Sequence, residues 1–221
     1  NLYQGASSVL TPPQFSLLME KLTVQLNFWE KKLLGISLLN ECPDFVRAEV
    51  LVVGEKLSSQ LMVQLMIAKD LSSDLFEPQA LLVATGAPLE SVVDIELSKA
   101  KFAQLPLASK RVWVMPGFTA GDKEGRIVTL GRNGSDYSAA VLSACLDATC
   151  CEIWTDVDGV YNTDPRVVTD AKLLSQLSYQ EAMELSYFGA KVLHPKTISP
   201  IARYHIPCYI RNSFNPSAIG T

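Results

Sequence analysis

The segment from residue 126 to residue 144 constrains the fold more than any other part of the sequence. Ile127 and Thr129 belong to a short alternating run that predicts a strand, and residues 137–142 have the small and apolar content of a buried helix start. The turn between them contains Gly131 and Gly134, which allow positive φ or a close backbone approach. A strand, a glycine turn and a helix N-terminus in succession present free backbone N–H groups to an anion.

The polar side chains of this turn predict which ligand it meets. Ser135 is a good N-cap residue, and Asp136 suits the positive end of the helix dipole. Arg132 offers a planar guanidinium to a carboxylate or a phosphate. From pattern alone, the turn is a general anion site.

Strands and helices alternate along the chain, which predicts an α/β fold with a largely parallel sheet. Dense apolar runs predict buried strands over 112–115, 151–155 and 206–210, with a shorter strand at 74–77. Helices are expected over 12–34, 44–68, 92–105, 136–149, 179–188 and 196–204, the first of them ending at Gly35. Residues 116–121 form a glycine-rich loop and 122–125 a hairpin turn. No repeat or domain boundary is evident, so the 221 residues are expected to form a single domain.

Composition disfavours several classes of protein. Hydrophobic residues make up 48% of the chain, enough for a real core, and the net charge of -4 argues against a nucleic-acid partner. No apolar run approaches the roughly 18 residues that span a bilayer, and no signal peptide pattern opens the chain. The five cysteines include no C-x-x-C pair and fit reduced, buried thiols, so we expect a cytoplasmic protein with no zinc site and no membrane partner.

Three polar features leave open the choice between a solvated surface and a ligand contact. Glu55 lies in an apolar helical stretch, where pattern alone favours a solvated face. The loop 156–166 is either a solvated connection or a nucleotide pocket, with Tyr161 on the base or ribose, Arg166 on the phosphates and a carboxylate near a metal. Lys191 is either solvated or a phosphate contact.

Four ordered segments resemble signatures of the amino-acid-kinase family in its aspartokinase form. The substrate segment is Gly54-Glu55-Lys56-Leu57-Ser58, and the second glycine loop is residues 131–139. The nucleotide loop is residues 154–166, and the third signature is residues 188–195. Residues 150–154 and 179–185 are most similar to the kinase half of bifunctional aspartokinase–homoserine dehydrogenases.

This resemblance implies a three-layer α/β sandwich with a largely parallel central sheet. It implies ATP-dependent phosphorylation of the L-aspartate side-chain carboxylate to 4-phospho-L-aspartate, which is the first step of lysine, threonine and methionine biosynthesis. ATP and Mg²⁺ would be the cofactors, L-aspartate the substrate, and the enzyme an allosteric homo-oligomer.

The resemblance also assigns residues to roles. Asp136 would organise the catalytic lysine and the phosphoryl centre. Arg132 would bind the aspartate α-carboxylate, and Glu55 its ammonium group, against the expectation from pattern alone. The turn residues Asn133, Gly134 and Ser135 would surround the substrate, and Thr155, Asp156, Tyr161, Arg166, Lys191 and Val192 would line the ATP site. No residue is assigned as a direct metal ligand. Phosphoryl transfer needs positioning and charge neutralisation more than covalent chemistry by the protein, which agrees with these residue types.

The sequence also departs from the family. Its members open with a strand and a Lys-Phe-Gly-Gly-Thr-Ser type loop that supplies the catalytic lysine, and no such motif stands in this chain. They continue past the segment matching Gly220-Thr221 into regulatory modules, and the bifunctional ones into a dehydrogenase. We therefore expect a kinase domain incomplete at its N-terminus, without regulatory or dehydrogenase regions, and inactive by itself. The alternative is a non-catalytic module that binds a nucleotide or an effector. A dinucleotide-binding oxidoreductase is disfavoured, because the Gly-x-Gly-x-x-Gly spacing is missing near a first strand.

Overall fold

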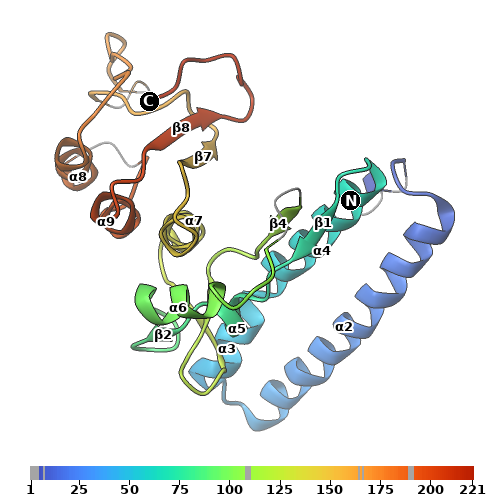
Figure 1. Ribbon diagram of the computed structural model, residues 1–221. Coiled ribbons are helices and arrows are strands. Elements are labelled where there is room, and N and C mark those ends of the chain that lie inside the picture. Colours follow the sequence, from blue (N-terminus) through green and yellow to red (C-terminus); the bar gives the residue numbers. More distant parts are fainter. Residues whose placement is uncertain (1–4, 7, 108–110, 164, 166, 189–191) are drawn as a thin grey trace. The chain divides into compact units, whose positions relative to one another are not determined.

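The chain folds into two compact units. The computed structural model describes residues 5–6, 8–107, 111–163, 165, 167–188 and 192–221 (Figure 1). The first unit comprises Asn1–Asp94 and Gln104–Gly131, and the second comprises Ile95–Ala103 and Arg132–Thr221. No change of composition marks this division, which is why the sequence pattern predicts one domain.

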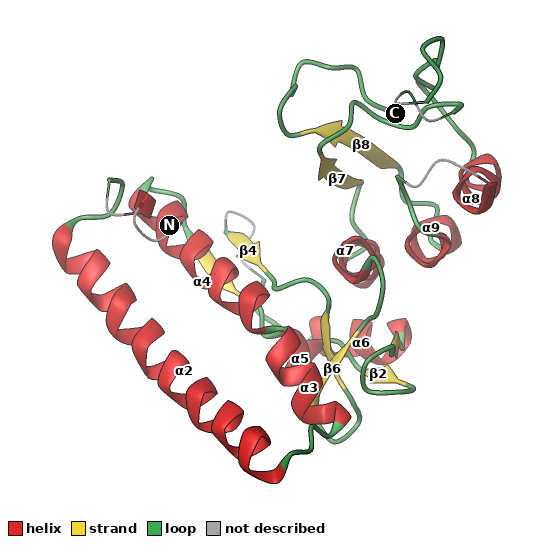
Figure 2. Ribbon diagram, turned by 180° about the vertical axis from the view of Figure 1, so that it is seen from behind, coloured by secondary structure: helices red, strands yellow, loops and turns green. Residues whose placement is uncertain are grey.

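The first unit begins with helices α2 (Pro12–Leu39), α3 (Asp44–Leu51) and α4 (Val53–Ala68), followed by the single turn α5 (Pro78–Leu81). Long helix α2 runs beside α4 (Figures 1 and 2), and Leu18 and Leu22 of α2 form a buried cluster with Leu61 of α4. The predicted capping box at the start of α2 is confirmed, since the backbone N–H of Thr11 donates to Gln14 Oε1 at 2.9 Å.

Two predictions about helix boundaries are wrong. Helix α2 does not end at Gly35 but continues to Leu39, because the left-handed cap residue is Asn40, with φ of 53°. The single helix predicted over 44–68 is two helices, and the break falls at Val52. Val52, the residue between the two helices, is fully buried.

The helical segment Asp44–Ala68 also bears on the expected absence of a membrane partner. In the described part of the chain it is long and apolar enough to cross a membrane, by length and composition alone. Core helices of soluble proteins meet the same criteria but are mostly buried, whereas 17% of the apolar window is buried here. Helix α4 packs against strands β1 (Ser73–Leu75) and β4 (Val112–Val114). The sequence lacks an uninterrupted apolar run there because Glu55 and other polar residues divide it.

Short strands complete the first unit. Strand β1 pairs in parallel with β4, whereas β2 (Ala84–Thr85) pairs with β3 (Val92–Val93) in antiparallel fashion. Strand β5 (Thr119–Gly121) forms an antiparallel hairpin with β6 (Ile127–Thr129), which confirms the turn predicted at 122–125. The second half of the predicted 116–121 loop is thus a strand.

The second unit packs helices around a parallel strand pair (Figure 2). Its elements are α6 (Ile95–Phe102), α7 (Gly134–Cys145), β7 (Cys151–Thr155), α8 (Tyr179–Phe188), α9 (Pro195–Arg203) and β8 (Cys208–Asn212). Strands β7 and β8 align residue by residue from Cys151 opposite Cys208 to Thr155 opposite Asn212. The core of this unit contains Ala140, Ala144, Ile153, Val160, Ile201, Ile206 and Ile210.

Several predicted boundaries in this unit shift for identifiable reasons. Helix α6 begins at Ile95 and not at residue 92, because residues 92–93 pair as strand β3. Strand β8 begins at Cys208, after Pro207, which has no N–H for the ladder. The ranges predicted for β7 and α8 match the observed elements.

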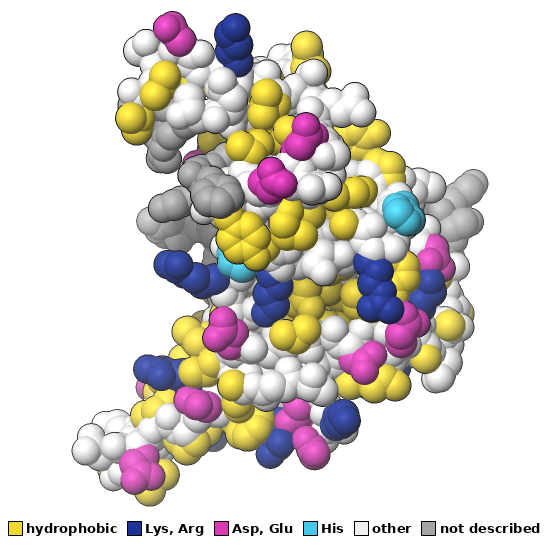
Figure 3. Space-filling model, turned by 90° about the vertical axis from the view of Figure 1, so that its left-hand side faces the viewer, with side chains coloured by type: hydrophobic (Ala, Val, Ile, Leu, Met, Phe, Trp, Pro, Cys, Tyr) yellow, Lys and Arg dark blue, Asp and Glu magenta, His cyan; other side chains and the backbone are white. Residues whose placement is uncertain are grey.

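The α/β class is confirmed. In the described residues the strands join in four separate pairs, two parallel and two antiparallel. Exposed apolar side chains such as Leu38, Leu39 and Phe214 remain, and Figure 3 shows hydrophobic side chains among charged ones on one face.

Candidate functional site

The predicted strand, glycine turn and helix N-terminus are all present. Strand β6 ends at Thr129, Gly131 has φ of +73°, and α7 begins at Gly134. A Cβ atom on Gly131 would lie 3.1 Å from Glu90 Cγ, so both its conformation and its surroundings favour glycine. The predicted N-cap is wrong: the cap residue is Asn133, in the left-handed region with φ of 53°, and Ser135 lies within the first helical turn. Asparagine tolerates this conformation better than serine does.

The start of α7 presents polar side chains of different exposure. Arg132, Asn133 and Ser135 are exposed, whereas Gly134 is buried. Asp136 is partly buried, and burial raises the pKa of its carboxyl above the ordinary value, although a hydrogen bond with the Asn133 side chain acts in the opposite direction. A carboxyl with a raised pKa beside an exposed arginine and a helix N-terminus is typical of a binding or catalytic site.

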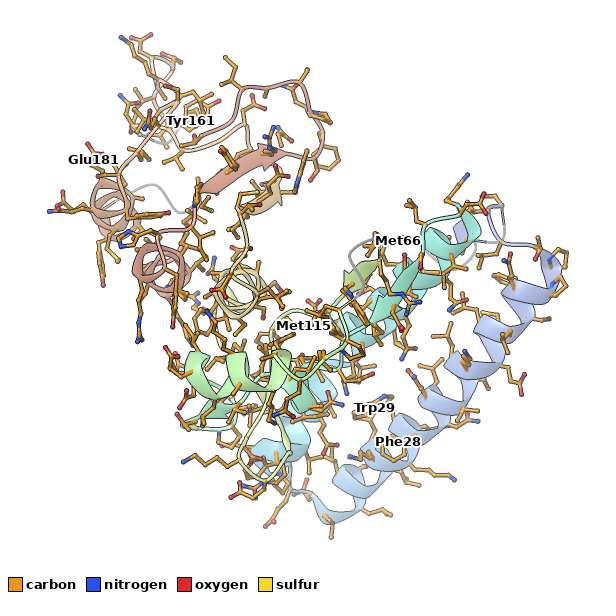
Figure 4. The ribbon with its side chains drawn as sticks, viewed as in Figure 1. Phe28, Trp29, Met66, Met115, Tyr161 and Glu181 are labelled. Atoms are coloured by element: carbon orange, nitrogen blue, oxygen red, sulfur yellow. The ribbon has the colours of Figure 1, made fainter. Side chains whose placement is uncertain are left out.

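The loop that follows β7 is held in place at several points. Asp158 Oδ1 accepts a hydrogen bond from Asn212 Nδ2 at 2.8 Å, at the end of β8. The backbone N–H of Val160 donates to Thr221 Oγ1 at 2.7 Å, and Tyr161 forms an isolated antiparallel bridge with Leu173. Figure 4 shows Tyr161 in this loop. The loop is therefore not the loosely solvated connection that its composition allowed.

The predicted nucleotide residues of this loop differ in their surroundings. Thr155 Oγ1 donates to Asp156 Oδ1 at 3.2 Å, and Asp156 is exposed at the carboxyl end of β7. Asp158, which the sequence pattern did not single out, anchors the loop. Its role depends on Asn212, which is 54 residues away in the chain, so no local signal could have revealed it.

A cavity of about 560 Å³ lies within the second unit. It is lined in part by Val160, Tyr179, Leu193, Cys208, Ile210 and Thr221. Val160 and Leu193 are the chain neighbours of the predicted nucleotide residues Tyr161 and Val192. Val192 itself is partly buried and packs against the core of the unit.

Two predicted phosphate contacts, Arg166 and Lys191, lie outside the described residues. Their roles stay predictions.

Glu55 belongs to the first unit, in the first turn of α4, where it is partly buried. Its neighbour Lys56 is also partly buried, and burial lowers the pKa of that ammonium group, while Glu77 raises it. The sequence pattern predicted no role for Lys56, because an isolated lysine in a helix is usually solvated. The predicted site residues are thus divided between the two units, Glu55 in the first and Arg132, Asn133, Gly134, Ser135, Asp136, Thr155, Asp156, Tyr161 and Val192 in the second.

Phe118 is a further residue that sequence reasoning missed. It lies in the 116–121 segment and has φ of 63°, an uncommon conformation for a bulky side chain. Such strain often accompanies a functional constraint.

Among the described residues, no group of three or more His, Cys, Asp or Glu side chains is placed so that it could hold a metal ion by itself. Mg²⁺ usually keeps waters and binds through one or two carboxylates together with substrate phosphates. The exposed carboxylate of Asp156 suits that mode, and so does the partly buried carboxylate of Asp136.

Comparison with known proteins identifies the fold family. The amino acid kinase family matches residues 13–212. The chain belongs to the amino acid kinase family. The chain is 54% identical over 188 residues to the bifunctional aspartokinase/homoserine dehydrogenase of Buchnera aphidicola, and the match covers 85% of the chain and 23% of that protein. It is 50% identical over 210 residues to the Haemophilus influenzae protein of the same name, covering 94% of the chain and 26% of that protein.

A solved structure agrees with these relatives. The fold of the chain matches that of E. coli aspartokinase III, crystallised in complex with aspartate and ADP, with a TM-score of 0.78 and 32% sequence identity. The match covers 99% of this chain and 54% of the E. coli chain. The chain therefore spans about a quarter of the length of the two relatives and about half of the aspartokinase III chain.

Proposed function

We propose that the protein transfers the γ-phosphoryl group of ATP to the side-chain carboxylate of L-aspartate, giving 4-phospho-L-aspartate and ADP. The observation that carries the proposal is the turn from Arg132 to Asp136 at the start of α7, in a chain similar over 99% of its length to an aspartokinase that binds aspartate and ADP.

The charged groups of aspartate account for the types of residue proposed to bind it. Aspartate carries an α-carboxylate and an ammonium group, and these match the exposed guanidinium of Arg132 and the carboxylate of Glu55. Asn133, Gly134 and Ser135 contribute polar groups and the N–H groups of the first turn of α7, which favour the negative charge that gathers during phosphoryl transfer.

Asp136 is proposed to position the group that stabilises the transferring phosphoryl. Its partial burial raises its pKa, and its side chain is hydrogen-bonded with that of Asn133 at the start of α7. A fixed carboxylate orients a neighbouring cation without reorganisation during the reaction, which is how preorganised sites lower a barrier.

The nucleotide is proposed to bind along the loop after β7. Thr155, Asp156 and Tyr161 would contact it there, with Arg166, Lys191 and Val192 completing the site. Asp156 and Asp136 are the carboxylates that would hold Mg²⁺, which would supply positive charge to neutralise the phosphates.

We further propose that this reaction serves lysine, threonine and methionine synthesis, that the protein is cytoplasmic and homo-oligomeric, and that end products regulate it. The names of the relatives, bifunctional aspartokinase/homoserine dehydrogenases, support only the aspartokinase step among these points. Neither nucleic acid nor membrane is proposed as a partner.

Isothermal titration calorimetry tests the proposal. Aspartate binding in the presence of ADP and Mg²⁺ should weaken by about 10- to 150-fold in Arg132→Ala, because a charge-assisted hydrogen bond contributes roughly 1.5–3 kcal/mol. Arg203→Ala is the matched control, since Arg203 is a mostly exposed arginine on α9 that contacts Glu96, and it should bind aspartate as the unchanged protein does. Nucleotide binding without any aspartate binding would instead favour a nucleotide-binding module without kinase function.

A further inference from the structure

Two cysteines face each other where β7 and β8 begin. Cys151 is paired with Cys208 in the parallel register, and the Cys151 N–H donates to the Pro207 carbonyl at 2.8 Å, which fixes the alignment at this end. Neighbouring strands lie about 4.8 Å apart. That spacing falls within the Cα–Cα range of roughly 4.4–6.8 Å found in disulfides. Both side chains belong to the same hydrophobic core, so they lie on the same face of the strand pair.

The two thiols are chemically unequal. The hydrogen bond from Cys208 lowers the pKa of Cys151 to about 7, with help from the Ser143 hydroxyl, while burial acts in the opposite direction. The same interaction raises the pKa of Cys208, as does its burial. This is the arrangement of a reactive dithiol, in which one sulfur is a stabilised thiolate and the other carries the proton.

The surrounding charged and titratable groups do not remove this asymmetry. Asp136 of α7 and Glu152 of β7 oppose the Cys151 thiolate by their negative charges, and burial and the two cysteines raise the pKa of Tyr179 on α8. Cys145, also buried in this unit, has no such thiol partner, and burial raises its pKa to about 12. Burial alone therefore does not make a reactive thiol here.

A small oxidant can reach the pair. Cys208 lines the cavity of about 560 Å³, together with Tyr179, Tyr209 and Pro207. Cys151 is the register partner of Cys208 and is 3% exposed. The volume of the cavity exceeds that of a small peroxide, which can therefore approach the pair from the side of Cys208.

We propose that Cys151 and Cys208 form a redox-sensitive dithiol that hydrogen peroxide or a small organic hydroperoxide converts into a cross-strand disulfide. The Cys151 thiolate attacks one peroxide oxygen, the O–O bond breaks, and the leaving hydroxide or alkoxide takes up a proton as water or alcohol. Cys151 is then a sulfenic acid. The Cys208 sulfur attacks the Cys151 sulfur, the S–O bond breaks, and the departing hydroxide takes the Cys208 proton to form water. The two sulfurs together lose two electrons, and the peroxide gains them.

The direct test treats the whole protein with hydrogen peroxide at neutral pH, blocks the remaining thiols with N-ethylmaleimide and maps the peptides by tandem mass spectrometry. The expected product links the tryptic peptide that ends at Arg211 to the peptide that contains Cys151, and dithiothreitol reverses it. The link should form at least about tenfold faster than any oxidation of Cys145, because the rate follows the thiolate fraction. Recovery of the two cysteines unlinked, or a link from Cys208 to Cys150, would overturn the proposal.

Matched variants sharpen the result. Cys150→Ser removes an exposed neighbouring thiol and should leave the link unchanged. In Cys208→Ser the sulfenic acid on Cys151 has no resolving thiol, so dimedone should trap it. Should Cys208→Ser fail to fold, as judged by circular dichroism, the mapping of the unaltered protein still decides the question.

Discussion

A methyl group added at Gly121 should destabilise the fold strongly. Gly121 lies in β5 against the turn α5, and a Cβ atom there would be 2.1 Å from the carbonyl oxygen of Gln79 and 2.9 Å from its carbonyl carbon. Both atoms are backbone, so no side-chain rotation relieves the overlap. We therefore expect Gly121→Ala to push β5 and α5 apart by roughly 1 Å to restore ordinary contact distances.

The free-energy cost follows from what that movement disturbs. The Gly121 N–H donates to the Leu82 carbonyl at 2.9 Å, just after α5, and weakening this bond costs about 1 kcal/mol. Overpacking in a close-packed region costs about 1–3 kcal/mol more. The expected loss is about 3 kcal/mol, which for a chain of this size lowers Tm by roughly 10 °C.

Gly35→Ala is the matched control, because the chemical change is the same. Gly35 lies inside α2 with nothing within 4 Å of an added Cβ. Alanine should stabilise the helix by about 0.5–1 kcal/mol. Thermal unfolding followed by circular dichroism measures both variants. If Gly121→Ala melts within 2 °C of the unchanged protein, the close approach of β5 to α5 is wrong.

Two further substitutions test the candidate site. Gly159→Ala adds a Cβ atom 2.4 Å from Thr221 Oγ1 at a residue with φ of +151°; we expect a loss of about 1–3 kcal/mol in urea unfolding and weaker ADP binding, and unchanged ADP affinity would contradict a nucleotide role for this loop. Asp136→Asn should raise Tm at neutral pH, because burial raises the pKa of Asp136, so that ionisation of this carboxyl at neutral pH destabilises the folded protein and the neutral amide avoids that cost. The Tm gain should vanish below about pH 4, near the ordinary pKa of aspartate, and an equal gain at all pH values would refute the charge explanation.

The sequence alone determined the local features of this protein. The strand, glycine turn and helix around residues 127–145, the hairpin turn at 122–125, strand β7 and helix α8 all follow from short-range patterns. Turn chemistry and hydrophobic periodicity act over a few residues, so they can be read without the rest of the fold. The ordered signatures carried the family resemblance in the same way, and the family match confirms it.

Only the tertiary structure decided features that depend on distant residues. The end of α2 beyond Gly35 depends on capping that outweighs the weak helix preference of glycine. Burial of Asp136 raises its pKa, and Asn212 fastens Asp158 from another strand. The sequence predicted scattered, reduced thiols, and it is the parallel register of β7 with β8 that brings Cys151 opposite Cys208, 57 residues later in the chain. Local apolar runs indicate which segments are buried, but which strands pair and in what register depends on contacts between distant residues, which no local pattern encodes.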